Sequence, residues 1–361
     1  MTAATGRSLG RREFLGAVGA GVSAAAVAGG SVAASAQTGG SPVEGKGAPL
    51  KVIDFHNHYV GPGFALTTLN GAPPSQRAYW EGVNRNLADP NALLASVEGA
   101  TISARVINTP TAFLQDADGN VPAGTDKRIN DHLADLAGKN AGRLYAMATV
   151  DAYSGDAGAR ELTRAVRELG LRGVFLESAK GGLLLDAPQA RPTLAAAASL
   201  GVPVFVHPVT DPAMHERFKR HGRLGVRLAR STINSAALFA MLEGGVFDEL
   251  PNLQVVVTTL AIGGVLMAGG FGDGSRLRRD TPPDKRRHVY IDTMGLHPAL
   301  LRSAVDLLGA DHVLVGTDWP IAEEKSVQDR LQKAFMVCGL TAAEQQMIAS
   351  GNVQRLLKIP G

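Results

Sequence analysis

The chain has 361 residues, of which 45% are hydrophobic, so it is long and apolar enough to build a large buried core. Its net charge of +3 is too small to support nucleic acid as an electrostatic partner. A single cysteine, Cys338, excludes an internal disulfide.

The amino-terminal segment has the order of an export signal. Arg11-Arg12-Glu13-Phe14-Leu15 precedes a run rich in Ala, Gly and Val that ends at Ala34-Ser35-Ala36. The paired arginines and the weakly hydrophobic run favour a twin-arginine signal over a general secretory one, and either over a membrane-spanning helix. We expect a signal peptide over residues 1–36, export to the periplasm or the exterior, and no membrane span in the mature chain.

Export would leave a nearly neutral protein. Residues 1–36 contain three arginines and one glutamate, so their removal lowers the net charge by two, from +3 to +1. Residues 37–50 are rich in Gly and Ser and are predicted to form a flexible leader.

From residue 51 onward, short runs rich in β-branched residues alternate with longer segments that carry apolar residues at helical spacing. The eight short runs are Val52–Phe55, Ala104–Thr109, Arg143–Val150, Gly173–Leu176, Pro203–His207, Gln254–Thr259, Val289–Thr293 and Val313–Asp318. The longer segments include Arg128–Asn140, Ala157–Leu169, Pro188–Leu200, Leu228–Leu242 and Pro298–Leu308. This alternation predicts an α/β fold with a parallel sheet and outer helices. Eight units favour a closed (β/α)₈ TIM barrel, in one domain over residues 51–361, over a doubly wound sheet.

One connection is too long to be a simple loop. The segment Tyr59–Asp89 follows the first run directly and contains Pro73-Pro74 and Tyr79-Trp80. We expect it to form an excursion over the functional site.

Candidate metal ligands stand at the ends of three predicted strands. His56 and His58 alternate along the first strand and therefore share a face, His207 ends the fifth, and Asp318 ends the eighth. In such a barrel the chemistry lies at the carboxyl ends of the strands. Three imidazoles and one carboxylate suit a borderline divalent ion such as Zn²⁺ with room for a water. Taken singly, His207 would read as a core histidine and Asp318 as a turn former or helix cap.

Several short stretches, in this order and spacing, resemble a known family. They are Asp54-Phe55-His56-Asn57-His58, Gly201–Pro208, Gly245–Asp248 with Pro251-Asn252-Leu253, Gly316–Pro320 and Gly351–Leu357. From about residue 51 to residue 359 the chain resembles the amidohydrolase superfamily, specifically the group that includes aminocarboxymuconate semialdehyde decarboxylase and related non-oxidative decarboxylases. The resemblance implies that His56, His58, His207 and Asp318 bind one divalent metal. It also implies that Asp318 handles a proton of the metal-bound water or of the substrate.

One departure concerns strand six, which in the resembled family usually ends in a histidine followed by two glycines. Here the stretch before Gly263-Gly264 places Thr259 or Ala261 at that position, depending on the direction of counting. Neither residue can shuttle a proton near pH 7. The resemblance also disfavours a two-metal centre, because in the family that histidine often helps to hold the second ion. Glu177 is a minor candidate for a bridging carboxylate. His297 is a candidate replacement base, although a histidine at a helix start is more often a solvated cap.

The expected function is hydrolysis of a small organic substrate through a metal-activated water, with Asp318, Thr259 and His297 as candidate catalytic residues. Decarboxylation of a small, aromatic carboxylic acid is the first alternative, and the missing strand-six histidine disfavours it because that reaction must protonate carbon. A metal-retaining binding or partner subunit without turnover is the second alternative. The expected cofactor is one divalent ion, Zn²⁺ before others, and a homodimer remains an open alternative for the assembly.

Overall fold

A computed structural model describes residues 49–69, 74–115, 121–272, 274–322 and 326–359. The predicted signal peptide of residues 1–36 lies outside these residues, and so does the predicted leader up to residue 48. Among the helices of the described ranges, none has the length and apolar character needed to cross a membrane.

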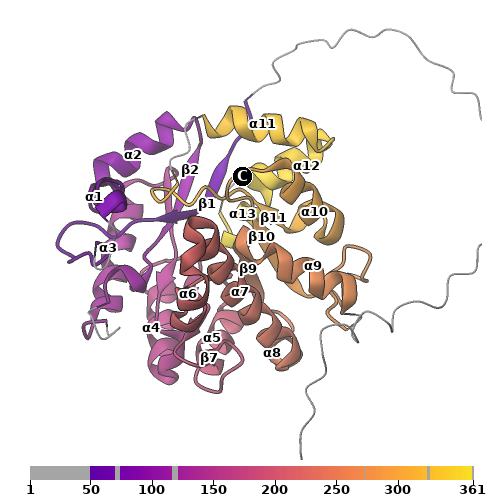
Figure 1. The fold of residues 1–361 in the computed structure, drawn as a ribbon, viewed down its shortest axis with the longest axis horizontal. Coiled ribbons are helices and arrows are strands. Elements are labelled where there is room, and N and C mark those ends of the chain that lie inside the picture. Colours follow the sequence, from indigo (N-terminus) through magenta and orange to yellow (C-terminus); the bar gives the residue numbers. More distant parts are fainter. Residues whose placement is uncertain (1–48, 70–73, 116–120, 273, 323–325, 360–361) are drawn as a thin grey trace, which may run out of the picture. The chain divides into compact units, whose positions relative to one another are not determined.

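Parallel strands form a ring in which chain order is also spatial order (Figure 1). The ring consists of β1 (Ile53–His58), β2 (Ala104–Asn108), β3 (Leu144–Ala146) with β4 (Ala148–Thr149), β5 (Val174–Glu177), β8 (Val204–His207), β9 (Gln254–Val257), β10 (His288–Asp292) and β11 (Val313–Leu314). β3 and β4 are one strand interrupted at Met147, and β6 (Ala179–Lys180) pairs with β7 (Leu183–Leu184) outside the ring.

The ring is closed by backbone hydrogen bonds between β1 and the residues that follow β11. The Phe55 N–H donates to the Val315 carbonyl at 2.8 Å, and the His58 N–H donates to the Trp319 carbonyl at 2.7 Å. The described residues therefore form the (β/α)₈ architecture that strand–helix alternation predicts.

Helices surround the ring (Figure 1), and the longer ones bury one face. In α10, for example, Leu301, Ala304, Val305 and Leu308 are buried at the spacing of one helix face. The helices are α1 (Pro74–Ala88), α2 (Pro90–Gly99), α3 (Thr125–Lys139), α4 (Asp156–Arg167), α5 (Arg191–Leu200), α6 (Pro212–Phe218), α7 (Gly222–Glu243), α8 (Val246–Glu249), α9 (Ile262–Phe271), α10 (Pro298–Leu308), α11 (Val327–Val337), α12 (Ala342–Gln346) and α13 (Asn352–Leu357).

An apolar layer fills the barrel beneath the polar strand ends. The rings of Phe55 and Phe175 lie 5.2 and 5.9 Å from the ring of Phe205, centroid to centroid. Residues of α13, among them Leu356, pack against the same buried cluster. The histidines at the strand ends therefore lie over packed apolar side chains and not over an open channel.

A bulge in β1 sets which side chains face inward. Asp54 pairs with Arg105 and Asn57 with Ile107, so Phe55 and His56 together oppose one residue of β2. This extra residue lets Phe55 join the apolar floor while His56 still faces the same side as His58.

The long connection after β1 contains a helix, α1, and contacts the segment that follows β11. The hydroxyl of Tyr79 donates to the carbonyl of Ile321, three residues after Asp318. The Thr67 N–H donates to the Phe113 carbonyl at 2.8 Å. These contacts place Thr67 and Tyr79 beside the segments that follow β2 and β11.

Candidate metal centre

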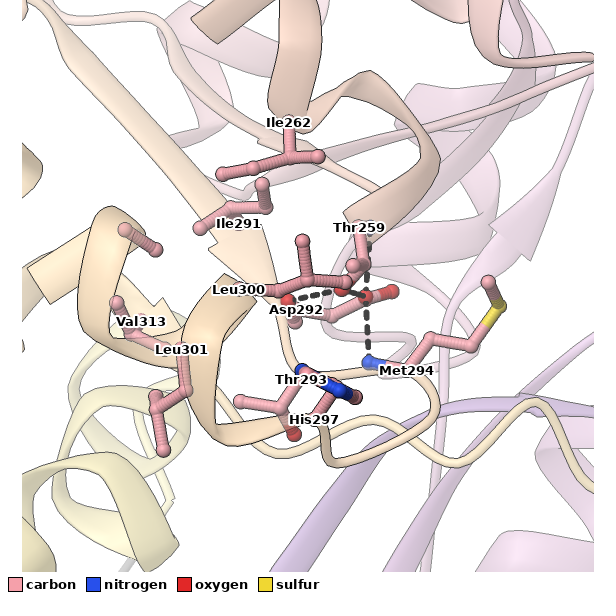
Figure 2. A pocket seen from close by; sticks show the side chains of 11 residues that line it. Thr259, Ile262, Ile291, Asp292, Thr293, Met294, His297, Leu300, Leu301 and Val313 are labelled. Carbon is pink, nitrogen blue, oxygen red and sulfur yellow. Dashed lines mark hydrogen bonds between the residues drawn. The ribbon is translucent and has the colours of Figure 1, made fainter. Parts of the chain in front are cut away.

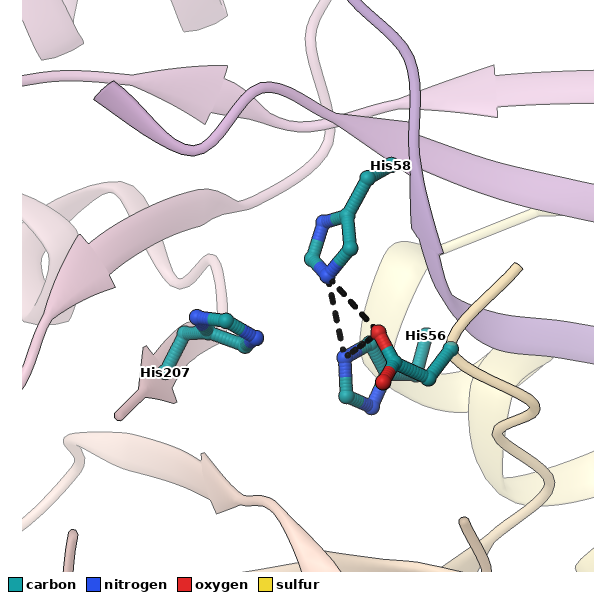
Figure 3. Close-up of side chains that lie close together, drawn as sticks. His56, His58 and His207 are labelled. Carbon is teal, nitrogen blue, oxygen red and sulfur yellow. Dashed lines mark hydrogen bonds and ion pairs between the residues drawn. The ribbon is translucent and has the colours of Figure 1, made fainter. Parts of the chain in front are cut away.

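Three histidines and one aspartate converge at the carboxyl ends of β1, β8 and β11. One ligand atom from each of His56, His58, His207 and Asp318 lies within 4.8 Å of all the others. The Nε2 atoms of His56 and His58 are 3.2 Å apart, and Asp318 Oδ1 lies 3.4 and 3.2 Å from them. Figure 3 shows the three imidazoles facing a common point. The four residues that the sequence nominates as ligands are thus brought together.

The outer ring nitrogens determine where the histidine protons lie. His56 Nδ1 is 2.6 Å from a carboxylate oxygen of Asp292, and His58 Nδ1 is 2.9 Å from the amide oxygen of Asn108. Both partners are acceptors, so each Nδ1 carries the proton and each Nε2 keeps its lone pair. Two lone pairs and an ionised oxygen of Asp318 then face one another at 3.2 to 3.4 Å. The repulsion among these atoms is relieved by a cation, either a proton on His56 or a divalent metal ion, and the donor set fits a divalent ion.

Burial keeps two of the histidines neutral. Removal from water lowers the pKa of His58 and lowers that of His207 well below its usual value. Burial also opposes the charge on His56, but Asp292 and Asp318 outweigh it and raise the pKa of this imidazole. His56 is therefore the ligand for which a proton competes most strongly with a metal.

Asp318 is the ligand that reaches solvent, with 17% of its side chain exposed. Burial opposes its ionisation, but the two β1 histidines, together with Arg230 of α7, hold the pKa of this carboxyl below its usual value. Its backbone has a φ of 67°, which a non-glycine residue rarely adopts. At Gly316, two residues earlier, a Cβ would lie 2.8 Å from that of His56. The loop therefore needs glycine there to approach the site closely.

Thr259, one of the two candidates for the strand-six position, is hydrogen-bonded to Asp292. Its N–H and its hydroxyl each lie 2.8 Å from one carboxylate oxygen of Asp292, and the Met294 N–H lies 3.0 Å from the same atom (Figure 2). The other carboxylate oxygen of Asp292 holds His56. Thr259 is thus connected to His56, one of the four candidate ligands, through Asp292. Ala261 is buried in the core cluster.

His297 and Glu177 are outside the group of four candidate ligands, although Glu177 on β5 pairs with His207 on β8. His297 is exposed and caps α10, accepting the Ala299 N–H at its Nδ1 at 3.3 Å. It borders a separate pocket with Thr259 and Asp292 between the strand ends and α10 (Figure 2). One oxygen of Glu177 accepts from the Thr111 hydroxyl at 2.5 Å and from a backbone N–H at 2.8 Å. Neither residue belongs to the group of atoms that could hold one ion.

A buried ion pair connects β1 and β2 next to the candidate ligands. Arg105 on β2 donates to Asp54 and Asn57 of β1, and its side chain is 1% exposed. Asp54 in turn accepts from the N–H and the hydroxyl of Thr317 at 3.0 and 2.6 Å. The network therefore ties the strand that carries two ligands to the loop that carries Asp318.

Sequence reasoning did not nominate Asn108 or Arg230. Asn108 ends a strand, as His207 does, and that position is the signal that could have identified it. Arg230 lies on α7. Burial has the largest effect on the pKa values of Asp318, Glu177 and His207, and the charge of Arg230 exerts a smaller lowering effect on each, although the pKa of Glu177 is raised overall. For Arg230, the signal that could have identified it is a positively charged residue on the apolar side of a predicted helix.

Known proteins share sequence and fold with this chain. The family model described as Amidohydrolase matches residues 53–359. The chain is 24% identical over 288 residues to a 2-amino-3-carboxymuconate-6-semialdehyde decarboxylase of Dictyostelium discoideum, covering 77% of this chain and 79% of the relative. It is 27% identical over 305 residues to a gamma-resorcylate decarboxylase of Rhizobium sp. (strain MTP-10005), covering 78% and 91%.

Solved structures show the same fold at low identity. A dihydroxybenzoic acid decarboxylase from Polaromonas sp. JS666, with bound manganese and the inhibitor 2-nitroresorcinol, aligns with a TM-score of 0.70 at 23% identity over 86% of this chain and 97% of that one. A 2,6-dihydroxybenzoate decarboxylase from Rhizobium aligns with a TM-score of 0.68 at 22% identity over 86% and 99%.

Proposed function

Since the chain belongs to the Amidohydrolase family, we propose that it is a metal-dependent, non-oxidative decarboxylase of a small aromatic carboxylic acid. The observation that carries this proposal is the intact four-residue ligand cluster in a chain whose curated relatives, over three quarters of its length, are decarboxylases. The relatives support decarboxylation better than the hydrolysis that the missing strand-six histidine favours.

The cofactor we propose is one divalent ion held by His56, His58, His207 and Asp318. When bound, such an ion would polarise a substrate oxygen and stabilise negative charge that develops during the reaction. The three imidazoles suit Zn²⁺, and Mn²⁺ is the second candidate because the Polaromonas structure contains manganese.

Asp318 is the residue we assign to proton transfer. Breaking the bond between the ring and the carboxylate releases CO₂ and leaves an electron pair on the ring carbon, which must then take up a proton. The two β1 histidines and Arg230 keep Asp318 ionised, so Asp318 first accepts a proton, from a hydroxyl group of a phenolic acid, and then delivers it to carbon. A phenolic acid is the substrate class because the relatives named above include a gamma-resorcylate decarboxylase.

The remaining residues of the site position these groups. Asp292 holds His56, and Thr259 holds Asp292, so the threonine has a positioning role rather than one at the reacting atoms. Asn108 holds His58 in the same way. The apolar floor formed by Phe175 and Phe205 excludes water from beneath the imidazoles.

The test is a measurement of carbon dioxide. Protein loaded with Zn²⁺ or Mn²⁺ is incubated with a panel of hydroxybenzoic acids that includes 2,6-dihydroxybenzoate, and with ester, lactone and amide panels. We expect one CO₂ per acid consumed, and loss of this reaction on chelation. Turnover confined to the ester, lactone or amide panel would instead establish a hydrolase. Metal retention with no turnover on any panel would establish a binding subunit.

A further inference from the structure

One face of α7 is fastened to the carboxyl ends of β8 and β9. Asn234 donates from its amide to the Val206 carbonyl at 3.1 Å and accepts from the Thr258 hydroxyl at 2.8 Å. These partners directly precede His207 and Thr259 in the chain. Asn234 therefore marks the point along α7 that is level with the strand ends.

Arg230 lies one helical turn before Asn234 on the same face of α7, because residues four apart in a helix are stacked. The later turns of α7 pack into the core through Leu238 and Met241. The turn that carries Arg230 therefore continues past the strand ends toward the mouth of the barrel. Side chains of a helix also lean toward its amino terminus, which carries the guanidinium further in that direction.

The charges around the mouth agree with this placement. Burial lowers the pKa of the Arg230 guanidinium, and the charges of Asp318 and Glu177 raise it by a smaller amount. Even so, no hydrogen bond or ion pair joins the Arg230 side chain to any residue within the described ranges. Arg230 is thus a half-buried cation near the strand-end ligands, and among the described residues no carboxylate is hydrogen-bonded or ion-paired to it.

A guanidinium in this position is suited to one kind of ligand. Its planar donors match the two oxygens of a carboxylate, and a buried cation gains most from an anionic partner. We propose that Arg230 binds the carboxylate of the aromatic acid beside the four metal ligands. This inference rests on the proposed function and specifies its substrate as an anion that is recognised through its carboxylate.

The assignment has a consequence for product release. The acid contacts Arg230 through the group that leaves as CO₂, whereas the remaining phenol has no such group. The phenol product therefore binds less tightly than the acid, and the contact with Arg230 accounts for the difference in affinity.

The test compares Arg230→Gln with Arg227→Gln, a control in which an exposed arginine on the same helix is neutralised. Calorimetry on the metal-loaded proteins measures binding of 2,6-dihydroxybenzoate and of resorcinol, which lacks only the carboxylate. We expect Arg230→Gln to weaken binding of the acid about 10- to 100-fold, the scale of a charged hydrogen bond, with resorcinol affinity and metal content unchanged. Arg230→Lys should recover part of the loss, and Arg227→Gln should match wild type.

Equal weakening of both ligands in Arg230→Gln would show a merely structural role and overturn the inference. Unchanged binding of the acid in that variant, or no measurable binding of the acid to metal-loaded wild type, would overturn it as well. Carbon dioxide release, measured in parallel, separates this inference from the proposed function. Arg230-dependent binding without CO₂ would refute only the function, and CO₂ release by Arg230→Gln with an unchanged KM would refute only the role of Arg230.

Discussion

Replacing Thr259 by Val tests whether the metal ligands depend on the chain Thr259–Asp292–His56. Valine has nearly the shape of threonine but lacks the hydroxyl, which here lies 2.8 Å from Asp292 Oδ1. The backbone hydrogen bond from residue 259 to Asp292 Oδ1, which is also 2.8 Å long, is kept in the variant. The hydroxyl also lies 2.5 Å from the main-chain carbonyl oxygen of Asp292. The substitution therefore removes a donor that contacts both the main chain and the carboxylate of the residue that fixes the ring of His56.

The magnitude follows from the loss of one hydrogen bond. A net contribution of about 1 to 1.5 kcal/mol corresponds to a loss of about tenfold in metal affinity. That figure lies at the lower edge of the range of about 10- to 100-fold for residues that orient a metal ligand. Competition against a chelator of known affinity measures the change directly.

Thr258→Val is a matched control because Thr258 is the neighbouring residue and is also buried. Its hydroxyl donates to Asn234 at 2.8 Å instead of to Asp292. Both variants should lower the melting temperature of the chelated protein, but only Thr259→Val should lower metal affinity. Equal metal affinities in the two variants would refute the positioning role of Thr259.

Three further predictions concern stability, pH and export. Arg105→Met leaves Asp54 buried without its cation and should lower the free energy of unfolding in urea by about 3 to 5 kcal/mol; a loss below about 1 kcal/mol would contradict a supporting role for this pair. Burial lowers the pKa of His207 from its usual 6.5, so the unfolded chain binds a proton at this histidine more readily than the folded protein does. The neutral imidazole therefore contributes its full stabilisation above about pH 6.5 and loses it as the pH falls toward the pKa of the folded state. The melting temperature of the chelated protein should therefore fall between about pH 7 and pH 5, and should fall less in His207→Gln, whereas equal slopes would count against a buried neutral imidazole. Arg11→Lys combined with Arg12→Lys should retain the protein in the cytoplasm, and normal export of the double variant on fractionation would disprove a twin-arginine signal.

The barrel and its ligand cluster were predictable because each depends on local patterns. Runs such as Pro203–His207 are strand-like by composition, and successive strands with helical connections pair in chain order. Once the ring is inferred, the carboxyl ends of its strands must meet at one end. His207 and Asp318 could therefore be assigned to one cluster although more than a hundred residues separate them.

Other features depend on contacts that a linear pattern does not contain. The bulge at Phe55 and His56 exists only relative to the register of β2. The partner of Thr259 is Asp292, on another strand, so the sequence alone does not distinguish a hydroxyl that faces a substrate from one that faces a carboxylate. The placement of Arg230 depends on how far α7 extends past the strand ends.

The reaction type was harder to infer than the site. The absence of histidine near Thr259 favours hydrolysis only if no other group can protonate carbon. Asp318 is ionised and partly exposed, so it can exchange a proton with a phenolic substrate or with solvent. The missing histidine therefore does not exclude decarboxylation, and the decarboxylase relatives favour that reaction over hydrolysis.

The most direct test of the metal centre is elemental analysis of the purified protein beside variants of two ligands from different strands. Wild type should contain about one divalent ion per chain, with zinc and manganese measured together. His207→Ala and Asp318→Ala should each contain far less, whereas His221→Ala, which removes an exposed histidine on the same chain, should match wild type. Unchanged metal content in both ligand variants would contradict the assignment of the four strand-end residues as a metal site.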